Sequence, residues 1–334
     1  MKINNITTLL LFSSLLFSGC EKYTSVKIVD ENFLEALIKL GVDSDGDGFI
    51  SFEEAEAVKT LNISYFYIFD LKGLESFTNL ETLRCGDNEL TSIDISHNTA
   101  LIYLDIYGNK LTSLDVSKNI NLETLVAMYN PLGTLDISNN KALKYLYCEG
   151  SRIVNLDVSN NLELKVLNCT ANSLTRIDVS KNSSLETLVC WINQIETLDV
   201  TLNPLLRSIS CGYNNLTSID LSHNVNLTSF ACGYNQLKSL NVSNNALLTN
   251  LNCENNQLTE LDISNNPQLL HLYCYNNSLT KLDISNCIHL RSIELSDMPT
   301  LEKVCVREMP FPPSNVFVNL NRSPNVYFST DCSK

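Results

Sequence analysis

The chain has 334 residues, of which 37 are acidic and 23 are basic, so its formal net charge is −14. This balance excludes nucleic acid as a partner and disfavours anionic membrane surfaces as partners of the body of the protein. The length alone would suggest two domains, but a repeat of fixed period, described below, grows in one dimension and need not divide.

Residues 1–19 have the features of a signal peptide, because Lys2 precedes an apolar run and two small residues lead to Cys20. The ending Phe-Ser-Gly-Cys resembles a bacterial lipobox, which implies cleavage before Cys20 and lipid attachment to its thiol. A plainly secreted protein is the alternative. No later apolar run reaches the ~18 residues of a membrane span. We therefore expect an extracytoplasmic protein at the outer membrane or the cell surface. Its lipid anchor is expected to be its only attachment to a membrane.

Residues 20–30 are predicted to be a polar tether, and residues 31–57 a helix–loop–helix, with helices over 32–40 and 52–61. The stretch between the helices, DSDGDGFISFEE, resembles the calcium loop of the EF-hand. The resemblance implies a Ca²⁺ site whose ligands are Asp43, Asp45, Asp47, the carbonyl of Phe49, Ser51 directly or through water, and a bidentate Glu54. Three neighbouring carboxylates repel one another unless a cation lies among them. An acidic turn without a cation is the alternative.

A unit with a 21-residue period then recurs ten times without insertion, with starts from Leu80 to Leu290. Apolar residues fall at offsets 0, 3, 5, 10, 13 and 15 from each start, and Asn falls at offsets 8 and 18. This spacing resembles the leucine-rich repeat, in its nested 21-residue bacterial class. The resemblance implies a β-rich solenoid over residues 80–300, with a short parallel strand in each coil and a second extended segment opposite. Residues 58–79 resemble a longer, internalin-like unit and are predicted to be the amino-terminal cap.

The repeated Asn residues are predicted to be structural, because a buried amide can satisfy both the N–H and the C=O groups of a turning backbone. The first column is expected to run from Asn109 to Asn277 and the second from Asn98 to Asn266. Ser151 interrupts the first column and Cys287 the second, so we expect both columns to weaken there.

Eight of the twelve Cys residues occupy offset 5, which points inward: Cys85, Cys148, Cys169, Cys190, Cys211, Cys232, Cys253 and Cys274. In-register stacking at about 4.8 Å holds neighbouring side chains parallel and their Cβ atoms too far apart for an unstrained disulfide. We predict reduced core thiols; disulfides or a buried metal ladder are the alternatives.

The two outward-facing flanks of the repeat differ. One is aromatic and varied, which favours recognition of a protein or a glycan. Its candidate binding residues are Tyr103, Tyr107, Tyr129, Tyr145, Tyr147, Trp191, Tyr213, Tyr234, Tyr273 and Tyr275. The alternative is that Tyr simply favours strands and stacks across coils. The other flank carries Asp at offset 14 in nine units, a column predicted to be held by backbone donors and Ser hydroxyls.

Catalysis finds no support, since the four His residues share no spacing with a nucleophile or a set of metal ligands. After Leu290 the apolar pattern shortens to an 11-residue spacing, and residues 301–334 are predicted to be the carboxy-terminal cap. Cys305 and Cys332 lie outside the ladder and are predicted to pair. The chain is therefore expected to be a non-enzymatic, lipid-anchored binding module with Ca²⁺ near its entrance. The alternative is a structural envelope component without a selective ligand.

Overall fold

The computed structural model describes residues 25–332. The predicted signal peptide, Cys20 with its predicted lipid, and the first part of the predicted tether lie outside the described residues. Within residues 25–332, no helix is long and apolar enough to cross a bilayer.

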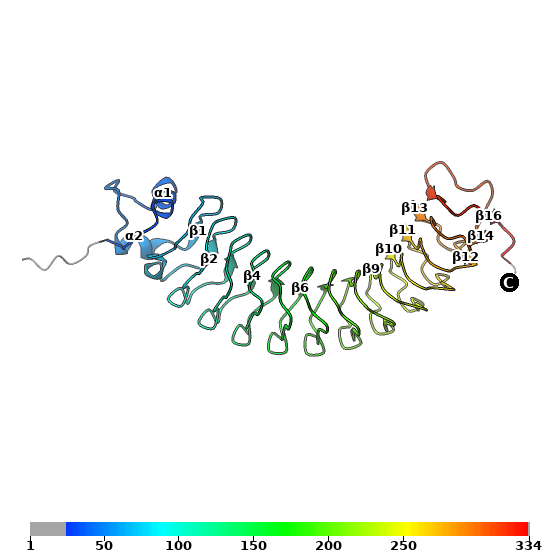
Figure 1. Cartoon of the computed structure of the whole chain (residues 1–334), viewed down its shortest axis with the longest axis horizontal. Coiled ribbons are helices and arrows are strands. Elements are labelled where there is room, and N and C mark those ends of the chain that lie inside the picture. The colour runs from blue at the N-terminus through cyan, green and yellow to red at the C-terminus, as the bar shows by residue number, and fades with distance from the viewer. Residues whose placement is uncertain (1–24, 333–334) are drawn as a thin grey trace, which may run out of the picture.

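The described residues wind into a stack of coils that curves like a crescent, with a helical segment at one tip (Figure 1). Each strand is short, because every coil turns sharply on both sides of it. The elements within residues 25–332 are α1 (Glu31–Lys39), α2 (Phe52–Ala57), β1 (Thr60–Asn62), η1 (Leu74–Ser76), β2 (Thr82–Arg84), β3 (Tyr103–Asp105), β4 (Thr124–Val126), β5 (Tyr145–Tyr147), β6 (Val166–Asn168), β7 (Thr187–Val189), β8 (Ser208–Ser210), β9 (Ser229–Ala231), β10 (Asn250–Asn252), β11 (His271–Tyr273), β12 (Lys281–Asp283), β13 (Ser292–Glu294), β14 (Lys303–Cys305), β15 (Phe317–Asn319) and β16 (Tyr327–Ser329).

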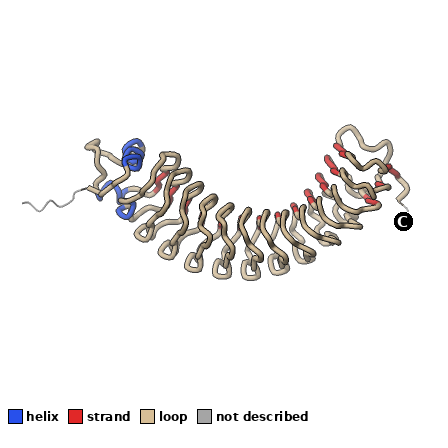
Figure 2. The backbone as a smooth tube through the Cα atoms, in the orientation of Figure 1, coloured by secondary structure: helices blue, strands red, loops and turns tan. Residues whose placement is uncertain are grey.

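One parallel sheet runs the length of the described chain and contains thirteen strands, β1 to β11 followed by β13 and β15. It lines the inner curve of the crescent, whereas the looped turns project from the outer curve (Figure 2). Equivalent residues of successive units pair directly, as Tyr103 does with Thr124 and Thr124 with Tyr145. A strict period requires such pairing without slippage. The predicted leucine-rich-repeat solenoid with parallel strands is confirmed.

Seven of the eight cysteines at offset 5, from Cys148 to Cys274, form a continuous column inside the coils, and Ile106 and Ala127 separate Cys85 from it. All eight are 0% exposed, and all are free thiols. Burial raises their pKa, to about 12 for Cys169 and Cys211, so the thiols stay protonated at neutral pH. A protonated thiol is a poor metal ligand and a poor nucleophile. The structure therefore favours small core residues over disulfides or a metal ladder.

The first Asn column closes the turn after each inner strand. Asn235 shows the pattern, since its Nδ2 donates to the carbonyls of Cys211 and Cys232, each at 3.0 Å, and its Oδ1 accepts the N–H of Leu216 at 2.9 Å. The amide satisfies both kinds of backbone group, as expected. Asn88 makes the same set of bonds, so the column begins one coil earlier than the predicted start at Asn109. At the interruption, the hydroxyl of Ser151 still donates to a core carbonyl.

The second Asn column uses only half of each amide. Nδ2 of Asn182 donates to the carbonyls of Val158 and Asn161, at 3.0 and 2.9 Å. In contrast, the Oδ1 atoms of all nine Asn residues in this column are buried without a hydrogen-bond partner within residues 25–332. The expectation that each amide serves both kinds of backbone group is therefore wrong for this column, because the backbone presents two carbonyls there. Cys287 places its thiol 4.0 and 3.8 Å from the corresponding carbonyls, a weaker contact, as expected at this interruption.

On the outer flank, the extended segments of neighbouring coils pair in only a few places within the described residues. Isolated bridges join Asp115 to Asp136 and Asn241 to Asp262. Near the carboxy-terminal end, β12, β14 and β16 form a three-stranded sheet.

The prediction that the repeat shortens to 11 residues after Leu290 is wrong. Lys303 pairs with Lys281 and Phe317 pairs with Ser292, and both separations exceed the 21-residue period. The coils therefore lengthen, and the short spacing is half of one coil, from its inner strand to its outer strand.

The amino-terminal segment differs from its prediction at one boundary. Asp30 caps α1 by accepting the N–H of Phe33, and Ser51 with Glu54 forms a capping box on α2. Helix α2 ends at Ala57, so the predicted helix over 52–61 is too long. Residues 60–62 are strand β1 instead, because pairing with β2 satisfies their backbone groups. The pairing of Thr60 with Thr82 makes this first coil slightly longer than the regular unit.

Candidate functional site

The concave face is the surface formed by the outward side chains of the inner sheet and by the turn residues that follow each strand. All ten predicted aromatic residues belong to these strands or the turns after them, and none of them is buried. Tyr129, Tyr213 and Trp191 are the most open, at 48%, 41% and 40% exposed. The predicted aromatic residues therefore share one face of the solenoid, as expected, and their rings reach solvent.

The rings near the amino-terminal tip contact one another and neighbouring charges. The guanidinium of Arg84 lies 4.8 Å from the ring centre of Tyr103, a cation–π distance. The rings of Tyr107 and Tyr129 meet edge to face at 5.5 Å. The hydroxyl of Tyr129 donates to Glu149 at 2.5 Å. Stacking across coils thus accounts for some of these tyrosines, although it leaves the rings partly exposed.

A second aromatic group, which we call the aromatic array, consists of Trp191, Tyr213 and Tyr234 on three successive coils. Trp191 contacts Tyr213 edge to face, with 5.2 Å between the ring centres. Tyr213 stacks on Tyr234 with 3.9 Å between the ring centres and an angle of 14° between the ring planes. Glycine makes room for the indole, since a Cβ atom on Gly212 would lie 2.5 Å from Nε1 of Trp191.

Glu254 is the residue of this face that sequence reasoning missed. It is half-buried on the coil after Tyr234, and a Cβ atom on Gly233 would lie 2.3 Å from its Oε1. The sequence did contain a sign of this packing. Offset 6 is glycine in two successive units, at Gly212 and Gly233, and a large side chain occupies the same offset in the unit before and in the unit after them. Only the folded coils show that Trp191 and Glu254 fill the space above those glycines.

A polar contact on the concave face was also missed. Nδ1 of His271 lies 2.7 Å from the hydroxyl of Ser292, and the hydroxyl of Tyr273 lies 3.4 Å from it. His271 and Ser292 share one offset in successive coils, so the 21-residue period brings them together. The contact belongs to a polar row across β11 and β13.

The predicted calcium loop brings its three aspartates together. One oxygen each from Asp43, Asp45 and Asp47 lie within 4.8 Å of one another. Asp43 accepts the N–H groups of Gly46 and Gly48, and both glycines have positive φ, as the sharp turn requires. The side chain of Ile50 is buried, and its carbonyl accepts the N–H of Val26 at 2.7 Å.

Glu54, the predicted bidentate ligand, occupies a different place from the three aspartates. Oε1 accepts the N–H of Ser44 at 2.6 Å, and Oε2 accepts the N–H of Ser51 at 2.9 Å. These bonds lower the pKa of Glu54 to about 2, the Ser51 backbone contributing most, so the carboxylate is charged at neutral pH. The donor set of hard oxygens and the Gly-rich turn fit Ca²⁺. Coordination by Glu54 requires it to exchange its bonds to the serines for the ion.

The Asp column on the outer flank is held by the chain itself. Oδ1 accepts the backbone N–H two positions later, as Asp157 does from Ser159 at 2.8 Å. This hydrogen bond, and then the one from the Ser159 hydroxyl, lowers the pKa of Asp157. Asn241 makes the same bond to Ser243, so the position needs an oxygen acceptor rather than a charge. The predicted structural role of the column is supported.

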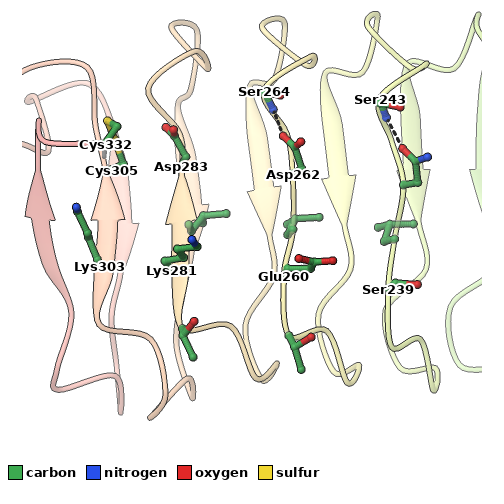
Figure 3. Close-up of a pocket in the computed structure, with 16 residues that line it drawn as sticks. Ser239, Ser243, Glu260, Asp262, Ser264, Lys281, Asp283, Lys303, Cys305 and Cys332 are labelled. Carbon is green, nitrogen blue, oxygen red and sulfur yellow. Dashed lines mark hydrogen bonds between the residues drawn. A yellow bond between two sulfur atoms is a disulfide. The ribbon is translucent and has the colours of Figure 1, made fainter. Parts of the chain in front are cut away.

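A groove of about 810 Å³ on the outer flank was not predicted. It crosses several coils near the carboxy-terminal end, and the side chains of Lys281 and Lys303 lie next to each other along it (Figure 3). Cys305 and Cys332 are joined as a disulfide beside it, with their Cα atoms 5.5 Å apart. On this flank the sequence prediction concerned only the repeated Asp at offset 14. The varied residues two positions earlier, such as Lys281, were therefore overlooked.

Comparisons with known proteins agree with this architecture. A family model described as leucine-rich repeats in two copies matches residues 78–119. Comparison with curated proteins finds no match. The functional domain of InlJ from Listeria monocytogenes is 31% identical with a TM-score of 0.70, and the match covers 89% of this chain. This chain spans 60% of the InlJ structure, which includes a cysteine ladder, as this chain does.

Two further solved structures share the fold. An internalin from Listeria monocytogenes, InlF, is 22% identical with a TM-score of 0.64, and the match covers 91% of this chain and 96% of InlF. A leucine-rich-repeat protein from Leptospira interrogans is 19% identical with a TM-score of 0.65, and the match covers 83% of this chain and 84% of that one. The repeat pattern, the match to leucine-rich repeats over residues 78–119 and the shared coil architecture together give this chain the leucine-rich-repeat fold, with bacterial proteins among its structural neighbours.

Proposed function

We propose that the chain is an extracytoplasmic, non-enzymatic binding module that recognises a protein or a glycan through its concave face. One observation carries the proposal: ten aromatic side chains project from the strands and following turns of one parallel sheet, and all of them reach solvent. Rigid aromatic side chains give a large contact area at a small cost in conformational entropy. A stack of coils with a buried core presents them without rearrangement.

Binding should depend on Tyr145 and Tyr147, which lie on strand β5, in the coil after the one that carries Tyr129. The test is a pull-down from envelope extract and a glycan array, performed with the mature chain and with the double variant Tyr145→Ala/Tyr147→Ala. A matched control is Ile120→Ala/Leu162→Ala, which removes exposed apolar groups outside the concave face. We expect at least tenfold weaker capture for the tyrosine variant and normal capture for the control. Equal capture by all three, or capture of nothing by the intact chain, would favour a structural envelope component.

We further propose that Ca²⁺ steadies the entrance to the solenoid. Asp43, Asp45 and Asp47 would hold the ion together with the carbonyl of Phe49, with Ser51 and with Glu54. The ion would neutralise three crowded carboxylates and fix the turn between α1 and α2. Isothermal titration of the metal-free mature chain with CaCl₂ tests this, and absence of heat at millimolar calcium would contradict it.

Anchoring through a lipid on Cys20 completes the proposal. The apolar run before Cys20 and the small residues beside it support it. Mass spectrometry of the protein from the native membrane, compared with a Cys20→Ala variant, would reveal the added acyl mass. Protease treatment of intact cells would then report whether the crescent faces the outside.

A further inference from the structure

Glu254 differs from two other glutamates of the concave face in having a buried carboxylate oxygen without a partner among the described residues. Glu149 accepts from the hydroxyl of Tyr129, and Glu294 accepts from Nδ2 of Asn319 at 2.7 Å. In contrast, Oε2 of Glu254 is buried and has no hydrogen-bond partner in the part of the chain that the structure describes. An unpaired oxygen of this kind leaves the charge of the carboxylate uncompensated, which is costly for a protein.

The surroundings of Glu254 are aromatic. It lies one coil beyond Tyr234, against Gly233, and its own backbone carbonyl accepts the N–H of Tyr234. Tyr275 follows on the next coil at the same offset, and its pKa is raised, first by burial and then by its interaction with Tyr234. Burial also raises the pKa of Glu254, as expected for a carboxylate that no cation compensates.

An electron-rich ring surface beside an uncompensated carboxylate attracts positive charge. Aromatic faces bind ammonium and guanidinium groups within about 6 Å of the ring centre, and a nearby carboxylate strengthens that attraction. Tyr213 and Tyr234 remain 41% and 37% exposed, so a side chain from a partner can reach the rings. The net charge of −14 also favours approach of a basic partner.

We propose that the aromatic array and Glu254 form a receptor site for a cationic side chain of a protein partner, preferably arginine. The planar guanidinium stacks on the exposed aromatic rings, and the negative charge of the carboxylate, whose unpaired oxygen is itself covered, attracts its positive charge. The inference rests on the proposed binding function and sharpens it, because a neutral glycan offers no such group.

The test uses the mature chain and a short capped peptide, acetyl-Gly-Arg-Gly-amide. Trp191 is the only tryptophan, so its fluorescence reports on the array directly. The comparison peptide carries citrulline, which has nearly the shape of arginine without the charge. We expect saturable fluorescence changes with the arginine peptide and at least tenfold weaker binding of the citrulline peptide.

Two variants test the role of the carboxylate. Glu254→Gln removes the charge, and Gly233→Ala inserts a methyl group 2.3 Å from the present position of Oε1, which must therefore move. We expect both to weaken binding of the arginine peptide at least fivefold. Glu260→Gln is the matched control, since Glu260 belongs to the same coil and lines the groove on the outer flank, and we expect it to bind normally.

Equal binding of the two peptides, or wild-type affinity in both Glu254→Gln and Gly233→Ala, would overturn the proposal. Failure of the cation site is distinguishable from failure of the wider function. If capture from envelope extract still depends on Tyr145 and Tyr147 while the arginine peptide does not bind, only the cation site is refuted.

Discussion

Removal of one amide from the first Asn column should destabilise the solenoid strongly. Asn235→Ala removes the acceptor for the N–H of Leu216 and one of the two amide donors at each of two buried carbonyls, those of Cys211 and Cys232. The carbonyls keep their second donors, the side-chain amides of Asn214 and Asn256. Each buried backbone group left without a partner costs roughly 1–3 kcal/mol. One such group, the N–H of Leu216, and two lost hydrogen bonds of roughly 0.5–1.5 kcal/mol each give an expected loss of at least about 2 kcal/mol in the free energy of unfolding.

The second column provides an internal comparison. Asn182→Ala also removes one donor from each of two carbonyls, those of Val158 and Asn161, which still accept the backbone N–H groups of Asn161 and Leu164. However, it removes an Oδ1 atom that is buried without a partner within residues 25–332, which offsets part of the cost. We therefore expect about 1 kcal/mol of destabilisation, clearly less than for Asn235→Ala.

The assay is urea unfolding followed by far-ultraviolet circular dichroism and by Trp191 fluorescence. Because a repeat array can unfold in parts, hydrogen exchange of the Leu216 amide should be measured as a local readout. Asn244→Ala is the matched control, since Asn244 is exposed and donates to the carbonyl of Ser222 at 3.0 Å from the surface of its coil. We expect a change within about 0.5 kcal/mol for the control. The reasoning fails if Asn235→Ala costs no more than the control, or if Asn182→Ala costs as much as Asn235→Ala.

Cys287→Asn should restore the donor missing from the second column and stabilise the chain by about 1 kcal/mol in urea unfolding; unchanged stability would contradict this. Calcium at a hundredfold excess over its dissociation constant should add about 2.7 kcal/mol of stability in scanning calorimetry, and Asp43→Asn should reduce that gain. The lowered pKa of Asp157 means that its stabilisation is present at neutral pH and is lost as the pH falls through that lowered pKa. An NMR titration should therefore place the pKa of Asp157 below the usual value for an aspartate, whereas an ordinary value would be inconsistent with the turn hydrogen bonds. The buried cysteines should resist thiol reagents in the native protein and react after denaturation; rapid native reaction would show that the core opens.

The elements that repeat could be predicted from the sequence. A side chain that recurs with the 21-residue period has one environment repeated in every coil, so the inward positions of Cys85 and its equivalents followed from the period alone. At the boundary of the repeat the same logic failed. Leu61 fits both a helical spacing and a strand alternation, and only the pairing of Thr60 with Thr82 decides between them.

The candidate site was predictable only in part. Tyr213 and Tyr234 were found because tyrosine concentrates on one flank of the repeat. Glu254 was missed because its importance depends on what its carboxylate lacks, which is a property of the packed coils and not of the residue type. The pairing of Lys281 with Lys303 was missed because the coil there is longer than the regular unit, so the fixed period placed them out of register.

The bond from the Val26 N–H to the Ile50 carbonyl and the antiparallel bridge between Ser25 and Ser51 have a mechanical consequence. Tension applied to the amino-terminal end of the chain is delivered first to these contacts, and therefore to the acidic loop. The loop is thus the point where a pulling force enters the crescent, so an ion held by its aspartates would oppose peeling of the first coil.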